Sequence, residues 1–250
     1  MPHYYMHPDL SLPEDASVIW RYLDVWKFED MIKKRSLFFS RADEQNDKDE
    51  GTYPNPILAE LDKRFGSFPS ADGNTYTFHE WHVQKERRSR LVSCWTLAPE
   101  SNQAWDIYTK SSNSVAVCSS IGRLKRCFHD HQEPVVWIGK VRYGERENTL
   151  PSSFHKWNVN VFLYPFFAKN EAYRWEREVR ATVNIALARQ ADFDSNERGC
   201  NIKADLQIII ESLLLHPRAA PDLKTKILAL LDSHGFRDAE INQSTWDRLP

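Results

Sequence analysis

Short blocks of apolar residues separated by polar loops run through most of the chain, and they predict strands interspersed with short helices. Segments rich in β-branched and aromatic residues predict strands. These segments are 17–22, 37–40, 91–96, 115–120, 135–143 and 176–185. Apolar residues that recur three or four positions apart predict helices. Such helices are expected at 26–34, 57–65 and 122–128, with one more after Pro99.

The pattern changes near the C-terminal end of the chain. Apolar residues recur at helical spacing from Ile202 until Pro217 stops the run, and a second run extends from Leu223 to about residue 234. A two-helix unit is therefore predicted over 202–234. Residues 1–16 are polar and interrupted by prolines, which predicts an N-terminal arm. We expect 17–250 to form a single α+β domain with a twisted, mostly antiparallel sheet.

Composition narrows the class of protein. A chain of 250 residues with nine Trp and 13 Phe can bury a substantial core. The net charge of −2 excludes a basic field over the whole surface, although basic patches occur at 85–90 and 123–126. None of the four cysteines forms a Cys-x-x-Cys pair, so a zinc site is not expected. Without a signal peptide or a long apolar run, we expect a cytoplasmic protein with no membrane partner.

One charged segment stands out, Glu176-Arg177-Glu178-Val179-Arg180. In an extended chain Glu176, Glu178 and Arg180 share one face, while Val179 and the residues that alternate with it face the other way. The charged face then lies either in solvent or in a cleft. Arg180 is expected to pair with Glu178 or with an acid from a loop.

Several motifs together carry a resemblance to a known family. They are Trp20-Arg21-Tyr22, the run 38–43, Glu50-Gly51, Ser93-Cys94-Trp95, Glu100-Ser101 with Trp105 and Tyr108, Val141-x-Tyr143, Glu176-x-Glu178-x-Arg180 and His216-Pro217. In this order the series resembles the bacterial domain-of-unknown-function family 2971, over roughly residues 18–245. One departure is Lys48, which follows Asn46-Asp47 where that family usually has a proline. The resemblance implies a bacterial protein and no settled activity.

A second likeness concerns order alone. An arginine on the first strand, hydroxyls at a later strand end and a Glu-x-Glu pair are similar to the motif set of ADP-ribosyltransferases. It implies that Arg21 holds the pyrophosphate of NAD and that Ser119 supports the nicotinamide ribose. One of Glu176 and Glu178 would stabilise an oxocarbenium-like centre, and the other would act on the acceptor. By extension the protein would be a toxin or defence effector. The hydroxyl motif departs from the pattern, because it reads Cys118-Ser119-Ser120.

Four further residues are expected to approach the Glu176–Arg180 segment and to bind substrate. They are Arg41, Asp43, Trp95 and Tyr108. Arg41 and Asp43 have an alternative role as a hydrogen-bonded hub that pins their loop to the sheet.

Two other classes of function stay open. Asp43, Asp47, Asp49 and Glu50 crowd one loop, and together with the two glutamates they would suit Mg²⁺ in a metal-dependent phosphodiesterase or nuclease. A non-catalytic binding or regulatory module would instead use Trp95, Trp105, Tyr108 and Tyr143 as a groove for a base or a peptide. The substrate is expected to be a nucleotide or nucleic acid, and the oligomeric state is left open.

Overall fold

The computed structural model describes residues 2–7, 10–45, 47, 49–70, 73–129, 132–144, 162–185, 198–236 and 239–246. Its α-helices are α1 (Val25–Lys34), α2 (Asn55–Phe65), α3 (Phe78–Trp81), α4 (Arg87–Ser89), α5 (Asn102–Tyr108), α6 (Ile121–Arg126), α8 (Leu206–Ile209) and α9 (Leu223–Ser233). Three 3-10 helices are described, η1 (Ala42–Glu44), η4 (Tyr164–Phe167) and η5 (Glu171–Glu176), and η2 (His82–Glu86) is a π-helix. In the described part of the chain no helix combines the length and apolarity that a bilayer crossing needs.

Most of the strands join one sheet. The strands are β1 (Pro2–Tyr4), β2 (Val18–Asp24), β3 (Ser36–Arg41), β4 (Ser67–Pro69), β5 (Thr75–Thr77), β6 (Arg90–Thr96), β7 (Ser114–Ser120), β8 (Gln132–Lys140), β9 (Arg142–Gly144), β10 (Ala168–Asn170), β11 (Glu178–Asn184), β12 (Gly199–Lys203), β13 (Ser212–Leu215) and β14 (Glu240–Gln243). The main sheet has the order β1-β8-β11-β6-β2-β7-β13-β14, and β3 pairs with β6 and β12. Its pairs are antiparallel except β1 with β8 and β13 with β14. The predicted α+β class with a mostly antiparallel sheet is confirmed.

The sheet splits along one edge of β6. β2 reaches β6 only where Trp20 faces Thr96, whereas β3 pairs with the other end of β6, where Ser40 faces Val92. The two strands therefore diverge from a common neighbour, and α1 connects them. α1 packs Phe28, Met31 and Ile32 toward the sheet.

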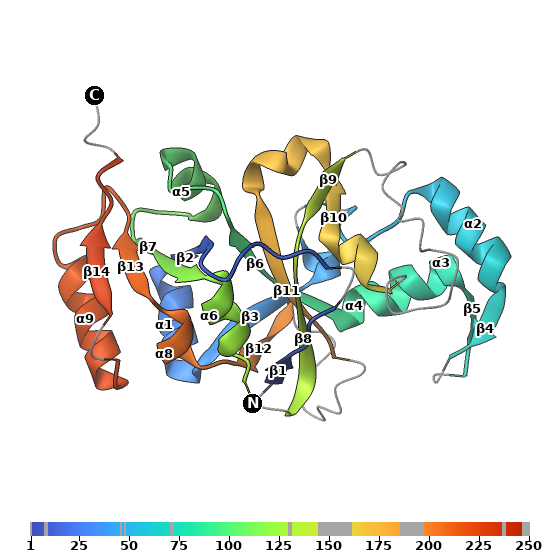
Figure 1. Cartoon of the computed structure of the whole chain (residues 1–250), viewed down its shortest axis with the longest axis horizontal. Helices are drawn as coiled ribbons and strands as arrows, with labels where there is room; N and C mark the ends of the chain where they lie inside the picture. The colour runs from blue at the N-terminus through green and yellow to red at the C-terminus, as the bar shows by residue number, and fades with distance from the viewer. Residues whose placement is uncertain are drawn as a thin grey trace.

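Different helices pack on the two faces of the sheet. The main core lies under α1, α6 and α9, and it contains Trp95 and Val179. The opposite face carries α5, whose Trp105 packs on Tyr22. Figure 1 shows α9 and β14 at one end of the molecule and α2, α3, β4 and β5 at the other. That second end has a core of its own around Leu61 and Phe78.

Three local predictions were wrong. The first helix of the expected two-helix unit is not continuous, because only 206–209 are helical and 212–215 pair with β7 and β14. Buried Leu213 and Leu215 alternate with half-buried neighbours, as in a strand. Part of the expected arm forms β1 beside β8. Glu176 ends η5 rather than starting a strand, since Arg177 adopts a left-handed conformation at φ 44°.

Candidate functional site

β11 presents charged side chains on one face only. Val179, like the other odd-numbered residues of the strand, packs into the main core, which leaves Glu178 and Arg180 on the opposite face. Both of these are buried. Glu176 approaches from the preceding turn, where Thr96 Oγ1 donates to the Glu176 carbonyl at 2.6 Å. The sequence therefore delivers two carboxylates to one place from two different elements.

Five side chains form what we call the acid cluster: Glu50, Lys169, Glu176, Glu178 and Arg180. Arg180 donates to Glu178 Oε2 at 2.7 Å, to Glu50 and to the carbonyl of Phe166 at 2.9 Å. Lys169 Nζ lies 2.7 Å from Glu176 Oε2 and 3.7 Å from both Glu50 Oε2 and Glu178 Oε2. Three carboxylates thus share two cations, so the cluster has one negative charge in excess when all five groups are ionised. The predicted pairing of Arg180 with Glu178 or a loop acid is confirmed, with both acids as partners.

His82 and Arg87 fix the backbone of the loop that carries Glu50. His82 Nε2 lies 2.7 Å from the Gly51 carbonyl, and Arg87 Nε donates to the Glu50 carbonyl at 2.9 Å. Gly51 has φ 66°, and a Cβ there would lie 2.7 Å from Cδ1 of Phe166. Glycine is therefore needed at this position both for its backbone and for the close approach of the ring. Burial lowers the pKa of His82 to about 4, so its ring is neutral at physiological pH.

The two glutamates near β11 differ in their tendency to hold a proton. Burial raises the pKa of Glu176 above its usual value, and the hydrogen bond from Lys169 offsets only part of that effect. Burial acts in the same direction on Glu178, but the charge and hydrogen bond of Arg180, together with Lys169, outweigh it and hold the pKa of Glu178 below its usual value. Carboxylates whose pKa values are pushed apart are suited to separate acid–base and charge-stabilising roles.

Aromatic side chains and a thiol border the cluster. The Tyr143 hydroxyl accepts from the backbone N–H of Glu178 at 2.8 Å. Tyr108 stacks on Tyr22, and burial followed by the negative charges of Glu176 and Glu178 raises the pKa of Tyr108. Burial also raises the pKa of Cys94, so its thiol stays protonated beside Glu178. These groups supply flat surfaces and neutral hydrogen-bonding atoms next to the carboxylates.

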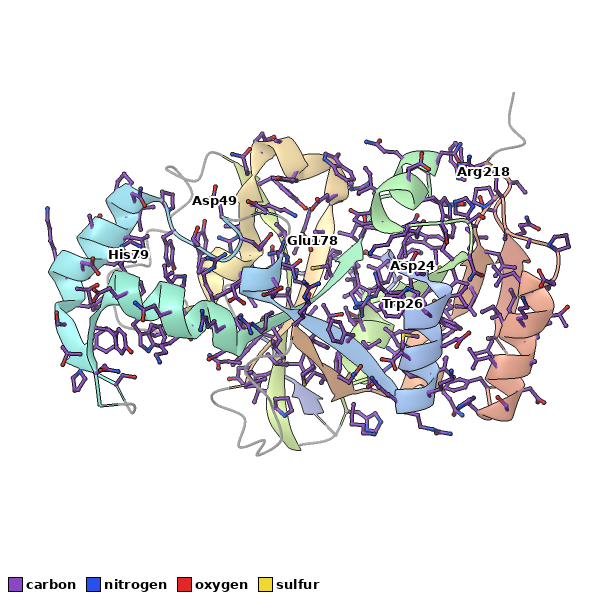
Figure 2. All side chains as sticks on the ribbon, turned by 180° about the vertical axis from the view of Figure 1, so that it is seen from behind. Asp24, Trp26, Asp49, His79, Glu178 and Arg218 are labelled. Carbon is purple, nitrogen blue, oxygen red and sulfur yellow. The ribbon has the colours of Figure 1, made fainter. Side chains whose placement is uncertain are left out.

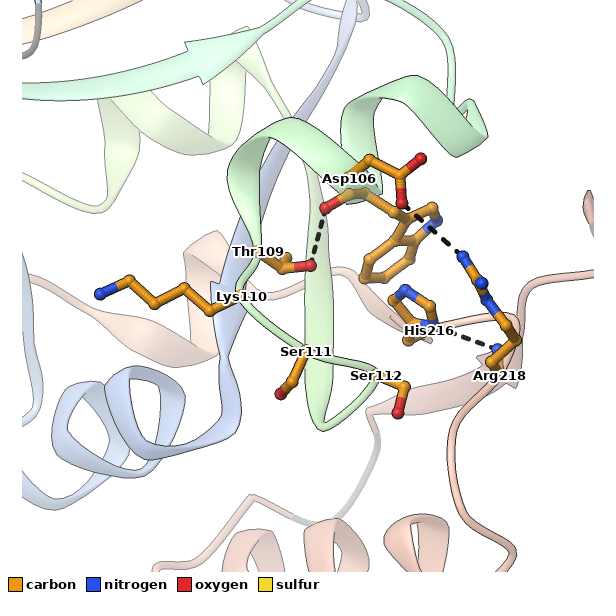
Figure 3. Close-up of a pocket in the computed structure, with 8 residues that line it drawn as sticks. Asp106, Thr109, Lys110, Ser111, Ser112, His216 and Arg218 are labelled. Carbon is orange, nitrogen blue, oxygen red and sulfur yellow. Dashed lines mark hydrogen bonds and ion pairs between the residues drawn. The ribbon is translucent and has the colours of Figure 1, made fainter.

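Two hollows lie near the strands and helices that carry these side chains. One of about 550 Å³ is lined by Trp20, Leu97, Lys140 and Arg177, and Arg177 separates the two glutamates in the sequence. The other, of about 350 Å³, lies at the end of α5 (Figure 3).

The α5 hollow has its own arrangement of side chains. Trp105 and His216 pack edge to face at 5.1 Å, and an ion pair joins Asp106 to Arg218 at 3.6 Å. Because Trp105 also packs on Tyr22, α5 connects this hollow with the aromatic border of the acid cluster.

The structure does not bring all of the predicted site residues together. The register of β2 with β6 and the alternation of side chains place Arg21 on the side of Ser93 and Trp95, opposite Glu178. Arg21 donates to Ser93 Oγ at 2.7 Å and lies over the Trp95 ring. Ser119 lies on that side as well, fully buried opposite Ile19. The prediction that Arg21, Ser119 and Trp95 converge on the glutamates was therefore wrong, whereas Tyr108 does lie near them.

Arg41 and Asp43 form a bidentate pair at 2.9 and 2.6 Å. Their hydrogen bonds match the structural hub that the sequence suggested as one of their two roles. Arg88 Nε lies 3.8 Å from the same carboxylate. In the described part of the chain no group of three or more His, Cys, Asp or Glu side chains is arranged to hold a metal ion.

Sequence reasoning missed the part played by Lys169 and placed Glu50 with the loop acids. Both reach the cluster through contacts that are distant in sequence, and no local spacing announces them. It also missed a second buried network on the same sheet face, in which Glu86 accepts from Arg90 Nε at 3.1 Å and from the amide of Asn184 at 3.1 Å. We call this the Glu86 network.

Comparison with known proteins gives a distant likeness of fold. No family model and no curated protein matches the chain, so membership in family 2971 stays a prediction. Among solved structures, DarT of Thermus sp. 2.9 matches in complexes with ADP-ribosylated ssDNA, with NAD+ and with carba-NAD+. Identity is 10–11%, coverage is 94–95% of this chain and 98% of the other, and the TM-scores are 0.39–0.40. At these values the function of DarT is not transferred to this chain.

Proposed function

We propose that this chain is an enzyme that transfers an ADP-ribosyl group from NAD to a nucleotide or nucleic acid, with the acid cluster at its centre. The observation that carries the proposal is the pair Glu176 and Glu178, two carboxylates that lie 2.7 and 3.7 Å from Lys169 and of which Glu178 also accepts from Arg180. Their pKa values shift in opposite directions. Glycosyl-transferring enzymes commonly use two carboxylates in this way. The excess negative charge of the cluster favours a positively charged centre beside it.

The residues divide the reaction between them. The bond between the ribose C1′ and the nicotinamide nitrogen breaks, the pair of electrons leaves with nicotinamide, and positive charge develops on the ribose. Glu178, which Arg180 keeps ionised, stabilises that charge. A hydroxyl or ring nitrogen of the acceptor forms the new bond to C1′. Glu176 takes the proton that the acceptor releases, for which its raised pKa is suited.

The surroundings supply binding groups for such a substrate. Tyr108 and Tyr143 lie near Glu178 and would contact the nicotinamide ring. Arg177 lines the hollow of about 550 Å³ and would hold the pyrophosphate there, in place of Arg21. Trp20, in the same hollow, offers a surface on which the adenine can stack. A role as a bacterial toxin or defence effector follows only if the acceptor is essential to a cell.

The test is a turnover assay with NAD. The purified chain is incubated with NAD labelled in its adenylate half, and released nicotinamide is followed by chromatography. Transfer of label to single-stranded DNA, RNA, free nucleotides and the chain itself is followed in parallel. We expect nicotinamide release with at least one acceptor and its loss in Glu178→Gln. Intact NAD in the presence of every acceptor would end the proposal.

A further inference from the structure

A third hollow lies in the split between β2 and β3, and no residue of the acid cluster lines it. Its volume is about 270 Å³, slightly below the range of roughly 300–1,000 Å³ that small-molecule sites span. α1 forms one wall, while β3 and β12 form the other. Figure 2 labels Trp26 of this hollow and Glu178 of the acid cluster.

Arg21 lines this hollow, and the described residues include no anionic partner for it. Its guanidinium donates to Ser93 Oγ at 2.7 Å and to the Phe38 carbonyl at 2.7 Å, and it lies 5.8 Å from the Trp95 ring centroid. None of these groups is charged, and no carboxylate in the described segments forms an ion pair with Arg21. Burial lowers the pKa of Arg21 to about 10. A cation withdrawn from water without a counter-charge is unfavourable, so an anionic ligand would be stabilising here.

Two aromatic side chains flank the same hollow and are unusually exposed. Trp26 on α1 is 63% exposed, and Phe38 on β3 is 42% exposed. Large aromatic side chains are mostly buried, and when they are exposed beside cations they commonly stack on planar ligands. Gly199 on β12 gives Phe38 its room, because a Cβ at that position would lie 2.7 Å from the Phe38 ring.

Polar groups complete the rim. Lys27 lies 5.4 Å from the centroid of the Trp26 ring, and it pairs with Asp24 at 3.4 Å. Lys34 pairs with Asp30 at 2.8 Å. These lysines already have carboxylate partners, whereas Arg21 has none among the residues that the structure describes. The side-chain amide of Asn201 adds a hydrogen-bonding group to the wall.

We propose that this hollow binds a single nucleoside monophosphate unit, with its phosphate on Arg21 and its base against Trp26 and Phe38. The chemistry requires both an anion and a planar ring. Such a unit is available as a free nucleotide or as the phosphorylated end of a nucleic acid strand. The proposal does not depend on the chemistry of the acid cluster, because no residue of that cluster lines this hollow.

The test measures binding by titration calorimetry with the full chain. AMP is compared with adenosine, which lacks the phosphate, and with ribose 5-phosphate, which lacks the base. We expect AMP to bind at least about tenfold more tightly than either fragment, since stacking and charge each contribute on that scale. A 5′-phosphorylated oligothymidylate and the same strand without its phosphate distinguish a strand end from a free nucleotide as the source.

Variants locate the binding. Trp26→Ala removes an exposed side chain, so it leaves the fold intact and is expected to weaken AMP binding about tenfold. Trp246→Ala removes another exposed tryptophan, outside the hollow, and serves as the matched control. Arg21→Met is expected to abolish the preference for AMP over adenosine. Failure of both AMP and the phosphorylated strand to bind, or equal AMP binding by Trp26→Ala and the unchanged chain, would overturn the proposal.

Discussion

The acid cluster and the Glu86 network lie on the same face of β11, yet they differ in charge and in surroundings. The Glu86 network pairs one carboxylate with one guanidinium, and the Arg90 guanidinium is covered by the rings of Trp137 and Phe166 at 5.5 and 5.3 Å. The acid cluster has three carboxylates for two cations, and the half-buried Tyr108 and Tyr143 border it.

The difference separates a structural ion pair from a candidate site. A balanced pair enclosed by aromatic rings carries no excess charge, whereas an excess carboxylate in a buried place costs stability unless a ligand or a reaction uses it. Phe166 touches both networks, because its ring covers Arg90 and its carbonyl accepts from Arg180. The two networks therefore share one support, and substitutions in each can be compared directly.

The largest difference is expected in stability. Glu86→Gln leaves Arg90 without its carboxylate and should lower the free energy of unfolding by about 3–5 kcal/mol. Glu178→Gln leaves Arg180 paired with Glu50 and Lys169 paired with Glu176, so we expect a loss of only about 1 kcal/mol. Urea unfolding of both variants measures the contrast. A larger loss of unfolding free energy in Glu178→Gln than in Glu86→Gln would contradict the excess negative charge of the acid cluster.

The glycine beside Glu50 should matter almost as much. Gly51→Ala combines a strained positive φ with displacement of the Phe166 ring, and we expect a loss of about 2–4 kcal/mol in unfolding free energy. Gly66 has φ 63° and open space around it, so Gly66→Ala reports the backbone strain alone. The difference between the two variants in urea unfolding isolates the contact with Phe166. Equal losses would mean that the ring moves aside freely.

The buried His82 ring should make the stability of the fold depend on pH. The pKa of His82 falls from 6.5 to about 4 on folding, so the unfolded chain binds the proton more tightly. The stability that the neutral ring contributes is complete above pH 6.5 and is lost as the pH falls toward 4, by up to about 3 kcal/mol. His82→Gln should remove this part of the pH dependence in thermal unfolding curves. The same slope in both proteins would contradict the buried, neutral ring.

A smaller effect concerns Glu176. Its raised pKa predicts that turnover falls on the acid side as this carboxyl takes up a proton. Glu176→Gln should slow transfer to the acceptor by about 10²-fold and abolish that acid limb. The rate of transfer measured against pH tests this. An unchanged acid limb in the variant would assign the titration to another group.

Much of the secondary structure could be predicted from local sequence. The helix α1 follows from the spacing of Phe28, Met31 and Ile32, and α5 follows from the capping side chain of Ser101. The segment 202–214 could not be assigned in this way, because its leucines and isoleucines fit a helix as well as a strand. Pairing of 212–215 with β7 and β14, which are distant in sequence, makes that part a strand, while 206–209 are helical.

The site was predictable only in part, for a similar reason. Alternation along one strand places Glu178 and Arg180 together, and that pairing is local. Alternation does not tell which face of β2 matches that face of β11, because the register of Trp20 with Thr96 sets it. Arg21 was therefore expected on the wrong side. Lys169 and Glu50 come from distant segments and have no signature of their own.

The rate of nicotinamide release from NAD by Glu178→Gln and Glu86→Gln tests the central claim most directly. Both are measured under conditions in which each variant is folded by circular dichroism. We predict a loss of about 10²–10⁴-fold for Glu178→Gln and a rate within about threefold of the unchanged chain for Glu86→Gln. Equal rates for the two variants would contradict the assignment of the acid cluster as the catalytic site.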